Sequence, residues 1–302
     1  MADSIGPLIA LWVLMYFSID VSYWITLALA VPAAGFMVRI FIIFHDCGHK
    51  SFFKEAKWNE RVGFFTGLFT FTPYHPWHRS HNKHHATVGN LDKRGVGDVM
   101  TMTTEEFKAA SRFRRLFYRI YRNPFVMFLI AAPLIFILRN RVFTRKLPAR
   151  EKWNIAWTNL TLLLLLAGVG WLIGFKTYLL IQLPVHYLAS IWGVWLFYVQ
   201  HQYSGVNWYR DKDWDYETVA LNGSSFYKLP RLLQWFSGHI GFHHAHHLSS
   251  RIPNYKLEQC HRENSLFWDI QPVTFSQSLK SLKLRLWDEK SHRLVSFRET
   301  GK

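Results

Sequence analysis

Four apolar runs limit the folds open to this chain. Residues 23–44, 153–172 and 178–199 hold almost no charge, and at about 1.5 Å per helical residue each is long enough for the about 30 Å hydrocarbon layer of a bilayer. The remaining run, Pro7–Ile19, is the first in the chain; it is shorter and needs a thinner bilayer or help from its neighbours. Half of the 302 residues are apolar and 17% are aromatic, as in membrane proteins.

The basic residues predict the orientation of these runs. All but two of the 36 Lys and Arg residues, Arg39 and Lys176 being the exceptions, lie in residues 50–122, 139–152 or 210–302. Cytosolic loops of membrane proteins are rich in Lys and Arg, so all three regions are expected on the cytosolic side. The short connections between paired runs then face outward, and the runs form two hairpins.

We therefore predict an all-α integral membrane protein with a single domain over residues 1–302. Four transmembrane helices form two hairpins, 7–44 and 153–200. Two cytosolic regions, 45–152 and 201–302, form a helical cap. The expected location is the bacterial inner membrane, with the active site on the cytosolic side.

The formal charge of +16 can indicate several partners. No homeodomain, zinc-finger or RNA-binding motif accompanies it, so an anionic membrane surface is favoured and no nucleic acid partner is expected. Two cysteines cannot build a disulfide framework, and Cys47 lies inside a histidine motif, which suits a reducing compartment. No Lys or Arg precedes the first apolar run, which argues against a cleaved signal peptide.

Histidines are clustered at the ends of the apolar runs. The motif HDCGH follows the second run, HNKHH lies further along the first polar region, HHAHH lies in the second polar region, and one histidine follows the fourth run. The corresponding residues are His45 and His49; His81, His84 and His85; His243, His246 and His247; and His201.

The spacing of these histidines predicts a metal centre. Residues three or four apart share one face of a helix, so each cluster can offer two or three imidazoles to one point. A structural zinc takes four ligands and a zinc hydrolase three, so nine histidines favour two metal ions. Imidazole binds several metals, and the spacing does not choose among them. The motif HDCGH also resembles a zinc-protease pair, but it lacks the general-base Glu.

A fifth apolar run, Pro124–Leu138, separates the second and third clusters. If it crossed the membrane, those clusters would lie on opposite sides and share no site. We therefore predict an interfacial or re-entrant helix pair, broken at Pro133.

Three segments, HDCGHKSFF, PYHPWHRSHNKHHATVGNL and GFHHAHHLSSRIPNY, resemble the histidine boxes of membrane acyl-lipid desaturases, especially the delta-12 and omega-3 branch and its bacterial relatives. The resemblance covers roughly residues 30–260. It implies a fatty acid desaturase that introduces a double bond into a lipid-linked acyl chain with O2, two iron ions and an external electron donor. No haem-type donor is fused to the chain and no flavin motif is present, so a separate ferredoxin or small cytochrome is expected on the basic face.

The resemblance also implies a division of ligands between the two irons. One iron takes His45, His81, His243 and His246, and the other takes His49, His84, His85, His201 and His247. Bacterial relatives often have Asn at the position of His239, which we expect in or next to the metal shell as a possible tenth member. Candidates for orienting the ligands are Asp46, Asp92, Asp98 and Asp215.

The remaining histidines have simpler interpretations. We expect His75, His78 and His244 to lie outside the metal shell, and His186, inside a span, to form a buried hydrogen bond. The alternative functions are a related di-iron hydroxylase or other oxygenase acting on a lipid or carotenoid, and a metal transporter. A transporter needs ionisable ligands at the middle of the membrane, whereas these clusters follow the ends of the runs.

Overall fold

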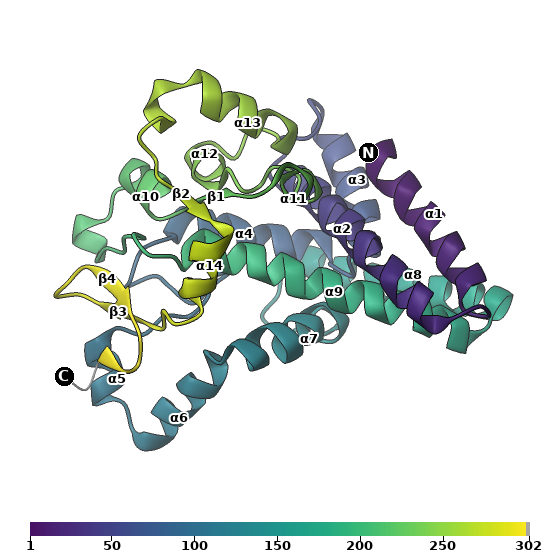
Figure 1. The fold of residues 1–302 in the computed structure, drawn as a ribbon, viewed down its shortest axis with the longest axis horizontal. Coiled ribbons are helices and arrows are strands. Elements are labelled where there is room, and N and C mark those ends of the chain that lie inside the picture. Colours follow the sequence, from purple (N-terminus) through teal and green to yellow (C-terminus); the bar gives the residue numbers. More distant parts are fainter. Residues whose placement is uncertain (300–302) are drawn as a thin grey trace. The chain divides into compact units, whose positions relative to one another are not determined.

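The computed structural model describes residues 1–299, and their fold is mainly helical (Figure 1). Contacts divide the chain into two compact units. The first comprises Met1–His78, Ala131–Val194 and Trp235–Gly238, and the second comprises Arg79–Ile130, Trp195–Gln234 and the chain from His239 onward.

The helices before residue 149 are α1 (Ala2–Ser18), α2 (Tyr23–Gly48), α3 (Ala56–Phe69), α4 (Tyr74–Thr87), α5 (Thr104–Ala109), α6 (Arg112–Tyr121), the π-helix η1 (Phe125–Ala131), α7 (Ala132–Ile137) and the 3-10 helix η2 (Arg139–Arg141). The later ones are α8 (Ala149–Ile173), α9 (Phe175–His201), η3 (Asp211–Asp213), α10 (Tyr216–Asn222), α11 (Arg231–Phe236), α12 (His243–Leu248), α13 (Asn254–Glu263), η4 (Ser265–Phe267) and α14 (Phe275–Ser281).

Within residues 1–299, three helices, α2, α8 and α9, are long and apolar enough to cross a membrane. They correspond to the three long runs of the sequence. Helix α1 is apolar but has only 17 residues, and a bent pair formed by α6 and Phe125–Arg141 would make a fourth span if it counted as one. The expectation of three long helices is confirmed, while four spans in two hairpins stay a prediction.

In the first unit, α1 and α2 pack against each other after a short turn. The hydroxyl oxygens of Ser18 and Thr26 lie 2.7 Å apart between them. Arg39 of α2 pairs with Asp3 of α1 at 3.2 Å, and its guanidinium lies 4.1 Å from the centre of the Trp235 ring. These contacts satisfy the one basic residue inside the second apolar run. Helix α3 packs on α2 and α8 and completes this group.

The connection between α8 and α9 is a single residue. Gly174 has φ +87°, a left-handed conformation that costs glycine little and other residues much more. The sequence predicts a short connection between these two apolar runs, and the structure confines it to this glycine.

The fifth apolar run differs from its prediction. The helix is interrupted at Arg122–Pro124, not at Pro133. Pro124 lacks an N–H and restricts the residue before it, which explains the break. Pro133 lies in the first turn of α7, directly after the π-helix, where its missing N–H is tolerated.

The second unit contains four short strands that the all-α prediction omitted. β1 (Phe226–Lys228) pairs in parallel with β2 (Pro272–Thr274), and β3 (Leu286–Asp288) pairs antiparallel with β4 (Arg293–Val295). Each has only three residues, too few for a period-2 pattern to be recognised in the sequence. Strand β1 contacts α12, which packs on α10, and strand β3 contacts α5.

Candidate metal centre

Four buried imidazoles converge inside the second unit. The Nε2 atom of His201 lies 3.1 Å from Nε2 of His84 and 3.0 Å from Nε2 of His243, and the Nε2 atoms of His243 and His247 are 3.0 Å apart. One nitrogen from each of the four rings lies within 4.8 Å of the other three. All four side chains are almost fully buried.

Three separate segments supply these rings. His84 belongs to α4 and His201 is the last residue of α9, whereas His243 and His247 are four residues apart on α12. An offset of four residues stacks side chains on one helix face, which explains why α12 contributes two ligand candidates. Tyr216 of α10 donates a hydrogen bond of 2.6 Å from its hydroxyl to the backbone oxygen of His247, and this bond fixes the C-terminal end of α12.

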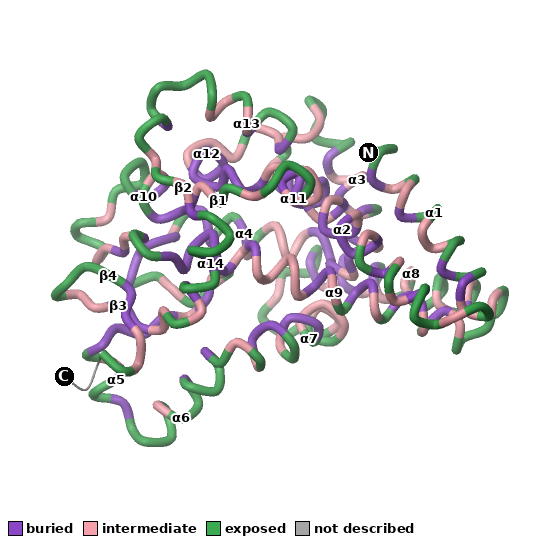
Figure 2. Tube along the Cα trace, in the orientation of Figure 1, coloured by how far each residue is buried: buried purple, intermediate pink, exposed green. Residues whose placement is uncertain are grey.

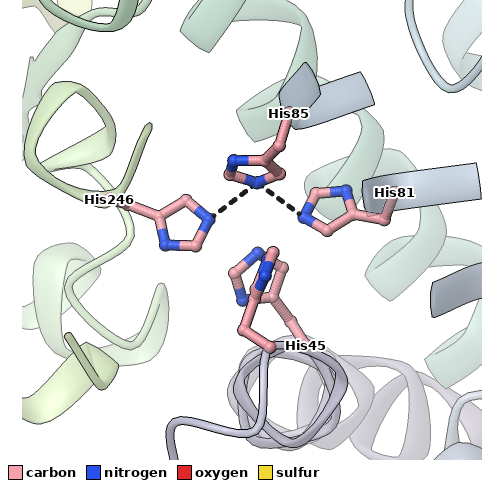
Figure 3. A group of neighbouring side chains, drawn as sticks. His45, His81, His85 and His246 are labelled. Carbon is pink, nitrogen blue, oxygen red and sulfur yellow. Dashed lines mark hydrogen bonds between the residues drawn. The ribbon is translucent and has the colours of Figure 1, made fainter. Parts of the chain in front are cut away.

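A second group lies beside the first. Figure 3 shows the rings of His81 and His246 turned toward His85. The Nε2 atom of His85 lies 3.1 Å from Nε2 of each of them. The rings of His85 and His247 stack with their centres 4.1 Å apart, so the two groups are neighbours in this unit.

These spacings fit metal ligands. Two imidazole nitrogens bound to one metal at about 2.0–2.1 Å lie about 2.8–3.4 Å apart when the bond angle is between about 90° and 109°. The observed 3.0–3.1 Å falls in this range. These Nε2–Nε2 contacts make a poor hydrogen-bond network. In a neutral ring, Nε2 either donates one hydrogen bond or accepts one, so it cannot serve two neighbouring Nε2 atoms.

The protonation state also suits ligands. Burial, with the neighbouring imidazoles as a further cause, holds the pKa of His247 well below its ordinary value. The ring is therefore neutral at physiological pH, as a metal ligand must be.

A backbone carbonyl orients one ligand candidate of the first group. Nδ1 of His201 lies 3.3 Å from the carbonyl oxygen of Gly223, to which it donates a hydrogen bond. Nε2 of the same ring then carries the lone pair that can bind a metal ion. Beside this ligand, the Phe197 ring lies 5.3 Å from the rings of both His84 and His201. Neither Gly223 nor Tyr216 carries a sequence signal for this role, because each acts from a loop or helix far from the motifs.

His45 and His49 lie at the end of α2 in the first unit. Their ring centres are 4.7 Å apart, in agreement with one helix face. Nδ1 of His45 lies 3.0 Å from the carboxylate of Asp46, and both side chains are buried. Of the four carboxylates considered as orienting partners, Asp46 is therefore one that contacts a candidate ligand.

The other three carboxylates have different partners. Asp92 pairs with Arg210 at 2.6 Å, Asp215 accepts a hydrogen bond from the backbone of Thr218 as the N-cap of α10, and Asp98 accepts one from the backbone of Gly95. Burial raises the pKa of Asp98 to about 6.

The grouping of the nitrogens differs from the division that the resemblance implies. His243 lies with His84, His201 and His247, and His85 lies with His81 and His246, so these two residues exchange places. His239 belongs to neither group. Its Nδ1 lies 3.2 Å from the Glu258 carboxylate, and its φ of +59° is unusual for a residue other than glycine.

The histidines expected outside the shell are also outside the two groups. His75 and His78 are absent from both. Nε2 of His244 lies 2.9 Å from Nδ1 of His261, and burial lowers the pKa of His244 to about 3. His186 hydrogen-bonds to Gln182, as predicted for a histidine inside an apolar run, and its ring stacks on Phe71.

The chain is thus a mainly helical protein with apolar helices long enough to cross a membrane and with two groups of buried histidines that could hold metal ions. The sequence pattern of the fatty acid desaturase family matches residues 22–278. A fatty acid desaturase of Bacillus subtilis is 49% identical over 97% of this chain and 83% of its own length. The chain belongs to the fatty acid desaturase family, whose members are oxidoreductases.

Two cyanobacterial relatives are more distant. An sn-1 acyl-lipid omega-3 desaturase (ferredoxin) of Nostoc is 32% identical over 72% of the chain, and an sn-1 oleoyl-lipid 12-desaturase of Synechocystis is 28% identical over 73%. The matches span 61% and 63% of these two proteins.

Proposed function

We propose that this protein introduces a double bond into an acyl chain of a membrane lipid, using O2, two iron ions and electrons from a separate donor. The observation that carries the proposal is the convergence of seven buried histidine rings, from three separate segments of the sequence, at spacings typical of metal ligands. The names of the cyanobacterial relatives support an acyl-lipid substrate.

The proposed centre uses all nine histidines. One ion is held by His84, His201, His243 and His247, and the other by His81, His85 and His246. The remaining ligands of the two-ion centre are His45 and His49. The bound irons supply the oxidising chemistry that an unactivated methylene needs and that no side chain provides.

The residues of the chain have simpler tasks in this proposal. The carbonyl of Gly223 keeps Nε2 of His201 turned to the metal, and Asp46 does the same for His45 by holding its Nδ1 proton. The ring of Phe197 excludes water beside His84 and His201. A dry, fixed ligand set requires little rearrangement during the reaction.

The proposed topology keeps both histidine-bearing regions on the cytosolic side. Helices α1 and α2 form one hairpin, α8 and α9 form the other, and the polar regions form a cap at the inner membrane of a bacterium. The distribution of Lys and Arg supports this orientation. A ferredoxin is the favoured electron donor, because a relative is named for it and because an acidic protein suits a basic surface.

Lipid analysis tests the function directly. The gene is expressed in a bacterial host with a simple fatty acid content, and its lipids are analysed by gas chromatography and mass spectrometry. A new unsaturated acyl chain is expected, and it should be missing with His243→Ala at equal protein level. A hydroxylated product would identify the related hydroxylase instead, and unchanged lipids in an iron-loaded, donor-supplied host would refute the proposal.

A further inference from the structure

Helix α6 is fixed to the second unit by Tyr118 and by the arginine that follows the helix. The hydroxyl of Tyr118 donates to the backbone oxygen of Arg285 at 2.6 Å and accepts from the backbone N–H of Met102 at 2.9 Å. Directly after the helix, the fully buried Arg122 donates to the side-chain oxygen of Gln202 at 2.7 Å and to the backbone oxygen of Leu284. These contacts set the rotation of α6 about its axis.

The opposite face of α6 is apolar and exposed. Phe113, Leu116, Phe117 and Ile120 are 76%, 53%, 68% and 45% exposed, and Figure 2 shows α6 as a largely exposed element. At about 100° per residue, these four side chains fall within an arc of about 100° that faces away from Tyr118. A continuous apolar surface of this kind marks an interaction site.

Arginines border this apolar face. Arg112 and Arg114 are exposed and lie on its two sides, and the guanidinium of Arg119, farther round the helix, lies 4.6 Å from the centre of the Phe297 ring. No acidic residue occurs in Arg112–Tyr121. The face therefore combines aromatic and aliphatic side chains with flanking cations, which is the composition of helices that lie in a membrane interface.

The apolar surface continues beyond the helix. After the break at Arg122–Pro124, Phe125, Leu129 and Ile130 of the π-helix are again exposed. Continuity with this apolar stretch favours a bilayer over a folded protein as the occupant.

We propose that α6 lies in the interface of an anionic bilayer, with Phe113, Leu116, Phe117 and Ile120 among the acyl chains and with Arg112 and Arg114 bound to lipid phosphates. The inference requires that the chain inserts into a membrane, as proposed above, but it does not depend on the enzymatic activity. Each basic residue near an anionic surface favours the bound state by about fivefold.

The test uses the full-length protein in nanodiscs. Phe117→Cys, in a Cys260→Ser background, carries an environment-sensitive fluorophore, and the background protein reports any labelling of the buried Cys47. Glu105→Cys on α5, an exposed position, is the matched control. Quenching is measured with aqueous iodide and with doxyl-labelled phosphatidylcholine or phosphatidylglycerol at equal fractions.

The expected result is strong quenching at position 117 by the doxyl lipids and weak quenching by iodide, with the reverse at position 105. Doxyl-phosphatidylglycerol should quench more than doxyl-phosphatidylcholine, and Arg112→Gln with Arg114→Gln should remove that difference. Iodide quenching at 117 equal to that at 105 would overturn the membrane contact. So would protection from both quenchers, which would indicate a protein partner or a second copy. Lipid quenching without a headgroup preference would show that the arginines do not select anionic lipid and would overturn that part of the proposal.

Discussion

Nδ1 of His45 lies 3.0 Å from a carboxylate oxygen of Asp46, its neighbour in the sequence, and both side chains are buried. A carboxylate in this position holds the Nδ1 proton and leaves Nε2 as the ligand atom.

Asp46→Asn should therefore weaken metal binding, by about 10- to 100-fold in affinity or activity. The measurement is iron content and product formation of the purified variant. Asp92→Asn is the matched control, because Asp92 pairs with Arg210 on the surface and contacts no candidate ligand. Equal iron content in the two variants would remove the role given to Asp46.

His239→Asn should be milder than His243→Ala. His239 lies outside both groups and contacts Glu258, so its replacement leaves the ligand nitrogens in place, whereas loss of His243 removes one of four converging rings. Activity and iron content of the two variants, measured side by side, decide this. A larger loss with His239→Asn would indicate that His239 ligates an ion directly.

The topology is tested at Lys93 and Lys256, which we expect on the cytosolic side. Single cysteines at these positions, in intact cells, should resist a membrane-impermeant reagent and react only after permeabilisation. Lys176→Cys, in the first turn of α9 and next to the connection from α8, is the control and should react in intact cells. Opposite labelling of positions 93 and 256 is incompatible with the two-hairpin arrangement.

The metal-free protein should lose stability as the pH falls below about 6.5. Burial holds the pKa of His247 well below its ordinary value and that of His244 at about 3, so these rings stay neutral when folded, whereas the unfolded chain takes up protons near pH 6.5. Each such group contributes a loss of up to about 1.4 kcal/mol per pH unit below 6.5, and none above it. The melting temperature between pH 7.5 and 5.5 measures the effect.

His244→Phe serves as the comparison, since His244 packs on the aromatic ring of Phe267. The variant should lose less stability on acidification than the parent. A melting temperature independent of pH in both proteins would show that the buried rings do not govern acid stability.

The ligand candidates could be predicted from sequence because helical spacing is local. His81 with His85, and His243 with His247, are four residues apart, so each pair shares a helix face. Their assignment to particular ions could not be predicted, since it depends on how α4, α9 and α12 pack. The contact between His201 and Gly223 joins residues 22 positions apart, and a periodic pattern in the sequence cannot predict such a contact.

The fold shows the same division. The long apolar runs predict α2, α8 and α9 well, because length and composition determine them. The position of the break before Phe125 could not be predicted, because the run contains two prolines, Pro124 and Pro133, and either can interrupt a helix. The sequence is apolar around both prolines and does not choose between them. The three-residue strands β1 to β4 are stabilised by tertiary packing rather than by their own sequence.

The most direct test of the metal centre is the iron content and product formation of each histidine-to-alanine variant, made one at a time in the full-length protein. Replacement of His84, His201 or His246 should abolish most product and lower the iron content, because ligands of a shared centre act as a unit. His75→Ala and His78→Ala should retain iron and most activity. Full activity in His84→Ala or His246→Ala, or a requirement for zinc instead of iron, would contradict the assignment.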